Sequence, residues 1–223
     1  MPEKTQSEIT YLLLEYTAAF KRPVFAAPSP PGQLIASILD ALGPSGYTFD
    51  GVEFSLQAPK LDEFAIVFRR TMPAVPARSF ALGFGKVNIR AENVDWTEAD
   101  RFISSHRAAL DAVREKGGAE IQSQQLVIGM NIQLKDRPRR DVTAPLLSPV
   151  AATLLDGKAD FSGVVLLQGK AIFVIDASIG IANGLFLRIS REHRPETSFE
   201  ELAEVLRNDE KRIFDVLGLE GAL

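Results

Sequence analysis

The sequence predicts an α+β protein with a mixed, mainly antiparallel sheet of about seven to eight strands, covered by two long and two short helices. Several stretches alternate apolar and polar residues, which is typical of strands that bury one face. Two longer stretches repeat their apolar residues at helical spacing. Glycines and prolines separate these stretches, but no long polar linker does, so we expect a single domain over residues 1–223.

The first part of this domain, residues 1–135, has the predicted order β-α-β-β-β-α-β and resembles a split β-α-β arrangement with an extra strand. We expect strands over residues 9–20, 52–57, 64–69, 79–90 and 126–134, and helices over residues 33–42 and 97–116. Gly43 and Pro44 end the first helix, because glycine suits the residue after a helix and proline cannot continue one. Gly83 and Gly85 predict a bulge inside the strand 79–90.

The second part, residues 136–223, has the predicted order α-β-β-β-α and packs on the first. We expect a charged loop over residues 135–140, a short helix from Ser148 to about residue 156, strands over 164–167, 171–179 and 185–191, and a helix over 198–217. Gln168-Gly169-Lys170 predicts a tight hairpin turn. Ser198 and Glu201 form a capping box at the start of the last helix, and Gly218 ends it.

Composition limits the classes of function. The 25 basic and 29 acidic side chains give a net charge of −4, so no global positive field attracts nucleic acid or anionic membranes. No run of about 18 apolar residues predicts a membrane span, and the first residues do not have the pattern of a signal peptide. The absence of cysteine excludes disulfides and thiolate metal sites and suits a reducing compartment. We therefore expect a cytoplasmic protein without membrane contact.

Two short segments resemble catalytic or cofactor motifs but lack their defining residues. Gly83-Phe84-Gly85-Lys86 is not a phosphate-binding loop, because the chain continues as a strand and offers no helix N-terminus. Asp176-Ala177-Ser178-Ile179-Gly180 lacks the leading glycine and the strand-to-helix turn of a nucleophile elbow. With only two histidines and no metal-ligand spacing, the sequence predicts no metal and no cofactor, and a non-enzyme is favoured.

Four polar residues on strand faces are candidates for a ligand-binding pocket between sheet and helices: Asn131, Asp176, Ser178 and Arg188. If they line one pocket, their side chains must converge. For Asp176, the simpler interpretation is that its strand face opens to solvent at the strand end, because a carboxylate on a buried apolar face is costly.

Three arginines are a weaker candidate for a nucleic-acid contact: Arg137, Arg139 and Arg140. Since the protein is acidic and no aromatic residues alternate with these arginines, a solvated loop is favoured. His106 lies on the inward stripe of its helix and is expected to be a hydrogen-bonded residue of the core margin rather than a catalyst. Asp209 lies on an apolar stripe, either because its helix projects beyond the core, which is favoured, or because it pairs with an inward-facing base.

The order of the segments resembles a sporadically distributed family of uncharacterised bacterial proteins. The resemblance rests on Trp96, which opens the long helix with Phe102 behind it, on Ile128-Gly129-Met130-Asn131-Ile132, on Phe173-Val174-Ile175-Asp176, and on Ile213-Phe214 in the closing helix. It covers about two thirds of the chain and implies a bacterial source and an α+β fold, but no activity.

The leading functional hypothesis is a non-catalytic binding or assembly protein that self-associates as a homodimer. A strand-rich chain has sheet edges and apolar faces that need to be covered, and no catalytic constellation stands out. The alternative hypothesis is a small-ligand-binding protein or enzyme with a pocket between sheet and helices.

Overall fold

A computed structural model describes residues 4–24, 31–56, 64–70, 77–93, 99–146 and 163–220 of the chain. These residues form two compact units. Unit 1 comprises Met1–Leu12, Val127–Arg191 and Ala203–Leu223, and unit 2 comprises Leu13–Leu126 and Glu192–Leu202. Each unit therefore combines segments that are distant in the sequence, whereas the sequence predicted two parts that meet at residue 135.

The described strands number ten, more than the seven to eight expected, and the α+β class is confirmed. The strands are β1 (Thr5–Phe20), β2 (Val52–Leu56), β3 (Phe64–Arg69), β4 (Arg78–Gly83), β5 (Lys86–Glu92), β6 (Ile121–Leu134), β7 (Val164–Gln168), β8 (Ala171–Ala177), β9 (Gly184–His193) and β10 (Leu219–Glu220). Their hydrogen-bonded order is β2-β3-β4-β5-β1-β6-β9-β8-β7, and β10 pairs in parallel with β1. The other registers that we describe are antiparallel.

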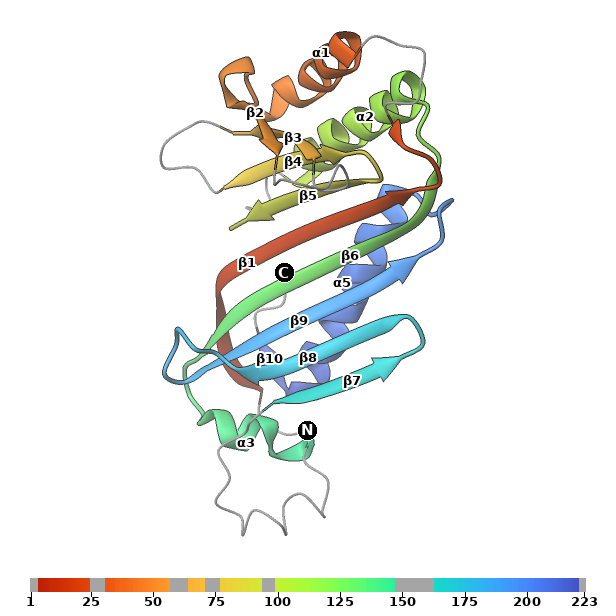
Figure 1. Cartoon of the computed structure of the whole chain (residues 1–223). Coiled ribbons are helices and arrows are strands. Elements are labelled where there is room, and N and C mark those ends of the chain that lie inside the picture. Colours follow the sequence, from red (N-terminus) through yellow and green to blue (C-terminus); the bar gives the residue numbers. More distant parts are fainter. Residues whose placement is uncertain are drawn as a thin grey trace. The chain divides into compact units, whose positions relative to one another are not determined.

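Unit 2 contains the antiparallel strands β2 to β5, and its helices α1 (Pro31–Leu42) and α2 (Ala99–Gly117) lie side by side (Figure 1). Its core is apolar because alternate residues of each strand point to one face. Phe68 and Phe80, which face each other across β3 and β4, are fully buried, with ring centroids 5.9 Å apart. On the helices, Ile38 and Val113 are fully buried.

Unit 1 contains the hairpin of β7 and β8, strand β9, the short helix α3 (Arg139–Thr143), and the larger part of α5 (Phe199–Leu217) (Figure 1). Phe173 and Ile175 on β8 lie opposite Ile189 and Leu187 on β9, and all four are buried. They point toward the face on which α5 lies, whereas the other face of the hairpin has no covering helix among the described elements.

The expected bulged strand over residues 79–90 is wrong. The chain instead reverses at Phe84 and Gly85, so that β4 and β5 form a hairpin in which Leu82 lies opposite Val87. Glycines inside an apolar run are compatible with either a bulge or a turn. Here the pairing of β4 with β3 and β5 requires the turn.

Other boundaries also differ. The charged loop expected over 135–140 ends at Pro138, because α3 begins at Arg139, and β10 was not expected. The short helix expected from Ser148 lies outside the described residues, as does Thr97, the expected cap of α2. The capping box is confirmed, since the Ser198 N–H donates to Glu201 Oε2 at 2.8 Å and the Glu201 N–H donates to Ser198 Oγ at 3.2 Å. Gly218 has a φ of 64° and ends α5, as expected.

Candidate functional site: an apolar edge strand and the groove behind it

Strand β7 ends the hydrogen-bonded order of the described strands, so one of its edges has no described neighbour. Its sequence, Val-Val-Leu-Leu-Gln, contains no charge and no proline. Proteins commonly protect sheet edges with lysine, proline or a covering element, because an open edge offers backbone groups to another strand. The opposite terminal strand, β2, has a charge: Glu53 accepts a hydrogen bond from Arg69 Nε at 2.9 Å. Of the two terminal strands, β7 is therefore the one whose edge is suited to pairing with another apolar strand.

The register of the hairpin shows which backbone groups face outward. Gln168 lies opposite Ala171, so the turn between them contains only Gly169 and Lys170, and Gly169 has a φ of 58°. The residues beside a two-residue turn form a hydrogen-bonded pair, and such pairs alternate along an antiparallel ladder. The backbone N–H and C=O groups of Val165 and Leu167 consequently point away from β8, toward the open edge.

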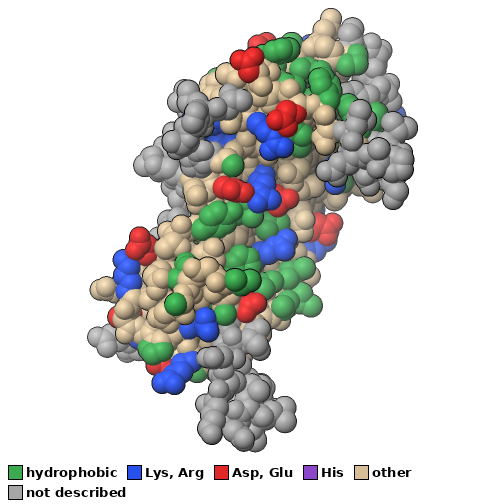
Figure 2. All heavy atoms as spheres, turned by 60° about the vertical axis from the view of Figure 1, so that its left-hand side comes forward, with side chains coloured by type: hydrophobic (Ala, Val, Ile, Leu, Met, Phe, Trp, Pro, Cys, Tyr) green, Lys and Arg blue, Asp and Glu red, His purple; other side chains and the backbone are tan. Residues whose placement is uncertain are grey.

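The same strand also exposes apolar side chains. Val165 is 61% exposed and Leu167 is 75% exposed, and both lie on the face away from α5. Ile172 lies opposite Leu167 and is 41% exposed, and Leu166, on the face toward α5, is 44% exposed. In the space-filling view, hydrophobic side chains are interspersed with charged ones over the visible face (Figure 2).

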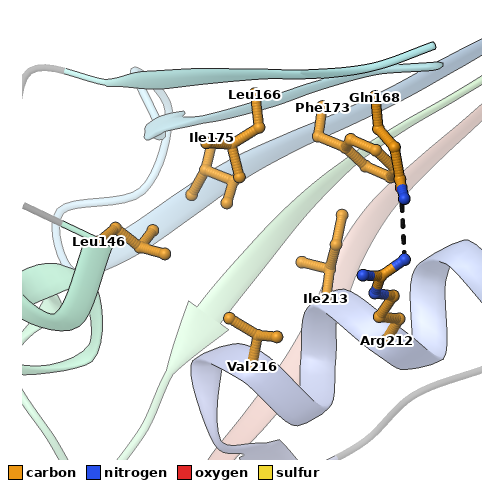
Figure 3. Close-up of a pocket in the computed structure, with 8 residues that line it drawn as sticks. All are labelled: Leu146, Leu166, Gln168, Phe173, Ile175, Arg212, Ile213 and Val216. Carbon is orange, nitrogen blue, oxygen red and sulfur yellow. Dashed lines mark hydrogen bonds between the residues drawn. The ribbon is translucent and has the colours of Figure 1, made fainter. Parts of the chain in front are cut away.

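Behind the hairpin, between β7, β8 and α5, lies a groove of about 270 Å³ (Figure 3). Leu166, Phe173 and Ile175 point into it from the strands, and Ile213 and Val216 point into it from the helix. Leu146 closes one end. The polar lining residues are Gln168 and Arg212, joined by a hydrogen bond of 3.3 Å from the guanidinium to the amide oxygen. The groove thus combines an apolar surface with one guanidinium.

Of the four residues predicted to line a ligand pocket, two are in contact. Ser178 Oγ donates a hydrogen bond of 3.0 Å to Asn131 Oδ1. The carboxylate of Asp176 accepts a hydrogen bond of 2.7 Å from the next backbone N–H, that of Ala177. Arg188 lies opposite Val174 and is exposed. None of the four lines the groove described above.

The three arginines predicted to contact nucleic acid make different interactions. Arg137 donates to Thr5 Oγ1 at 3.3 Å, and the backbone N–H of Arg139 donates to Asn183 Oδ1 at 2.9 Å. Arg140 forms an ion pair of 3.4 Å with Asp141 and is strongly exposed. The side chains of Arg137 and Arg140 thus contact protein partners in unit 1, whereas the contact of Arg139 is made by its backbone.

The favoured expectation for Asp209, that its helix projects beyond the core at this residue, is wrong. The residue is buried, and its two carboxylate oxygens accept hydrogen bonds of 2.7 Å from Nε and Nη2 of Arg191. The alternative expectation, a pair with an inward-facing base, is confirmed. The base lies on β9, where alternation places Arg191 on the same face as the buried Leu187 and Ile189. That this face meets Asp209 of α5 is a result of tertiary packing, which the strand pattern does not contain.

His106 is fully buried, in agreement with the expected core position. Its Nε2 lies 3.0 Å from the Tyr47 hydroxyl, and the rings meet edge to face with centroids 5.7 Å apart. Its Nδ1 lies 3.4 Å from Ser105 Oγ, which is 2.5 Å from Ser45 Oγ. We refer to Ser45, Tyr47, Ser105 and His106 as the histidine cluster. Sequence reasoning identified only His106, because Ser45 and Tyr47 are distant from it in the chain and the adjacent Ser105 has no distinguishing pattern.

No helix among the described residues is both long enough and apolar enough to cross a membrane. The described residues also contain no group of three histidine or carboxylate side chains placed to hold a metal ion. Searches against protein-family models and curated proteins gave no match for the chain.

Proposed function

We propose that this protein is a non-catalytic binding or assembly protein that self-associates, with β7 of one copy pairing antiparallel with β7 of a second copy. The observation that carries this proposal is the uncharged edge of β7, which has no neighbour among the described strands, with Val165 and Leu167 exposed beside outward-facing backbone groups. A sheet edge of this kind is a template for another strand.

The proposed pair has two-fold symmetry, with Leu166 on the axis. Val165 then lies opposite Leu167 of the second copy, and Leu167 lies opposite its Val165. Because both residues direct N–H and C=O groups outward, the two strands exchange four backbone hydrogen bonds. A two-fold interface brings the same surface of both copies together, so an edge without charge meets no like-charge repulsion.

Apolar burial on both faces accompanies these hydrogen bonds. Val165 and Leu167 cover each other across the pair on one face, and the two Leu166 side chains meet on the other, beside the groove. The burial of branched aliphatic side chains is the main favourable term in such an association. Because only five residues of each β7 pair, we expect a dissociation constant on the order of micromolar.

Sedimentation velocity over a micromolar concentration series tests the proposal with two substitutions. Val165→Pro removes an outward N–H, which β8 does not use, and proline is tolerated at such edge positions. Leu167→Glu places two carboxylates in the pair. Both variants are expected to be monomeric at concentrations at which the unmodified protein is dimeric.

Ile179→Glu is the matched control, because Ile179 is a fully exposed aliphatic residue in the loop after β8. This variant is expected to remain dimeric. Phe54→Glu tests the other terminal strand, β2, where Phe54 is 63% exposed. A monomeric unmodified protein, or a dimer that Phe54→Glu dissociates and Leu167→Glu does not, would contradict pairing through β7.

The groove favours a second candidate function, the binding of a small apolar ligand with a carboxylate. Its lining is aliphatic and aromatic, and Arg212 at its rim supplies a positive charge. A fluorescent aliphatic carboxylate tests this function. Val216→Asp is expected to abolish its binding and to leave the sedimentation coefficient unchanged, whereas equal binding by this variant would contradict the candidate.

A further inference from the structure

Arg70 in unit 2 has two buried guanidinium nitrogens for which the described part of the chain provides no hydrogen-bond partner. They are Nε and Nη1, while the residue as a whole is partly exposed. None of the ion pairs in the described part of the chain includes Arg70. Arginine retains its charge under all ordinary conditions, so it cannot relieve this burial by losing a proton. Buried polar groups in native proteins are almost always hydrogen-bonded, and the exceptions require an explanation.

The backbone around Arg70 holds its side chain in this place. Its own N–H donates to the Arg78 carbonyl at 3.1 Å, directly after β3. The guanidinium lies against Gly46, where a Cβ would come within 3.1 Å of Nε and 3.7 Å of Nη2. Gly46 has a φ of 85°, a conformation that suits glycine. The close approach of the guanidinium to the chain therefore depends on the absence of a side chain at residue 46.

The neighbourhood is positive and rich in hydroxyl groups. Gly46 stands between Ser45 and Tyr47, which are members of the histidine cluster. Burial raises the pKa of the Tyr47 hydroxyl, and the nearby charges of Arg78 and Arg70 act in the opposite direction. These two arginines thus lie close enough to Tyr47 to act on its ionisation. An environment with two guanidinium groups and neutral hydroxyls is complementary to a small negative group.

We propose that Arg70 is the central group of a binding site for a small oxyanion, a carboxylate or a phosphate, in unit 2. The planar guanidinium fork matches the oxygen geometry of both groups. The partly exposed side chain gives the ligand its approach. Its guanidinium turns toward the ligand, so that Nε and Nη1, which are covered in the structure, donate hydrogen bonds to the bound oxygens. Arg78 adds a second positive charge. This site is independent of the strand pairing proposed for β7, which lies in unit 1.

Thermal unfolding and isothermal titration calorimetry test this site with inorganic phosphate and with succinate, each against sodium chloride at equal ionic strength. A ligand that binds only the folded protein raises its melting temperature in a saturable manner. At least one of the two oxyanions is expected to do so, while chloride is not. The comparison of the two shows whether the site prefers a phosphate or a carboxylate.

Arg70→Met and Arg69→Gln form a matched pair of variants. Arg69 is the preceding residue, with an exposed side chain that pairs with Glu53. Arg70→Met is expected to weaken oxyanion binding about tenfold or more, because it removes hydrogen bonds to a charged group. Arg69→Gln is expected to bind like the unmodified protein. Arg70→Lys keeps the charge but loses the fork, and we expect intermediate affinity.

Stability without ligand separates a binding role from a structural one. In Tris chloride, Arg70→Met is expected to melt no lower than the unmodified protein, because it removes a charged group with two buried nitrogens that have no partner among the described residues. A strongly lowered melting temperature in that buffer would show a structural partner and overturn the proposal. So would the absence of a saturable response to both oxyanions, or equal binding by Arg70→Met.

Discussion

The carboxylate of Asp209 and the guanidinium of Arg191 form a two-point hydrogen-bonded pair that is largely buried inside unit 1. Removal of one partner from such a pair leaves the other charge buried without compensation. We expect Asp209→Ala to lower the free energy of unfolding by about 3 kcal/mol, measured by urea denaturation. Asp215→Ala, an exposed position on the same helix, is the control and is expected to cost nothing measurable. A loss of equal size in both variants would contradict this role of the pair.

Tyr16 and Tyr47 are buried. The Tyr16 hydroxyl donates to Gln124 Oε1 at 2.8 Å, and the Tyr47 hydroxyl lies 3.0 Å from His106 Nε2. Burial raises the pKa of both hydroxyls above their ordinary value of 10.0. In the unfolded chain these tyrosines lose their protons near pH 10, whereas in the folded protein they keep them. The unfolded state therefore binds fewer protons above pH 10, so the stability that these groups contribute below pH 10 is lost as the pH rises through and beyond that value.

We predict a free energy of unfolding that declines above pH 10, measured by urea denaturation at a series of pH values. The decline is expected to be less steep in Tyr47→Phe, because phenylalanine has no proton to lose. The same substitution is expected to cost about 1 kcal/mol at neutral pH, since it leaves His106 Nε2 without its hydroxyl partner. An unchanged slope above pH 10 would show that the Tyr47 pKa is not raised.

At the scale of single elements, the hairpin of β4 and β5 depends on two glycines that have different roles. A Cβ on Gly83 would come within 3.1 Å of the Phe64 carbonyl oxygen, because Gly83 lies opposite Ala65 in the ladder. A Cβ on Gly85 would meet nothing within 4 Å. We therefore expect Gly83→Ala to destabilise the protein by about 1 kcal/mol in thermal or urea unfolding. Gly85→Ala is expected to change stability by much less, and the reverse order would contradict this interpretation of the hairpin.

The sequence predicted elements where a local pattern is sufficient and failed where a distant partner decides. The strand 64–69 and the capping box of α5 follow from alternation and from a three-residue spacing. The division of residues 79–90 into two strands does not, because Gly83 and Gly85 are compatible with a bulge or a turn until pairing with β3 and β5 is known.

The candidate site shows the same limit. The hairpin turn at Gly169 was predictable, and the apolar run of β7 is visible in the sequence. That β7 is a terminal strand is a property of the sheet order, which no local pattern contains. That two guanidinium nitrogens of Arg70 have no hydrogen-bond partner among the described residues is similarly a result of tertiary packing, since nothing in its sequence neighbourhood distinguishes it from the exposed Arg69.

At the scale of the whole molecule, the two compact units share four elements. β1, β6, β9 and α5 each begin in one unit and end in the other, because the division falls at Leu12, Leu126, Arg191 and Leu202. A helix or strand that loses its order in one unit loses the cooperative hydrogen bonding that supports its continuation into the other. The units are therefore expected to be coupled through the backbone itself.

We predict one cooperative unfolding transition, in which the calorimetric and van't Hoff enthalpies agree. Hydrogen exchange provides the sharper measurement, with Asp209→Ala as the perturbation in unit 1. If the units unfold together, the slowest amides of β4 in unit 2 lose the same protection as those of β8 in unit 1, because both exchange through global unfolding. A loss of protection confined to β8, or two separate calorimetric transitions, would show that the shared strands and helix do not couple the units.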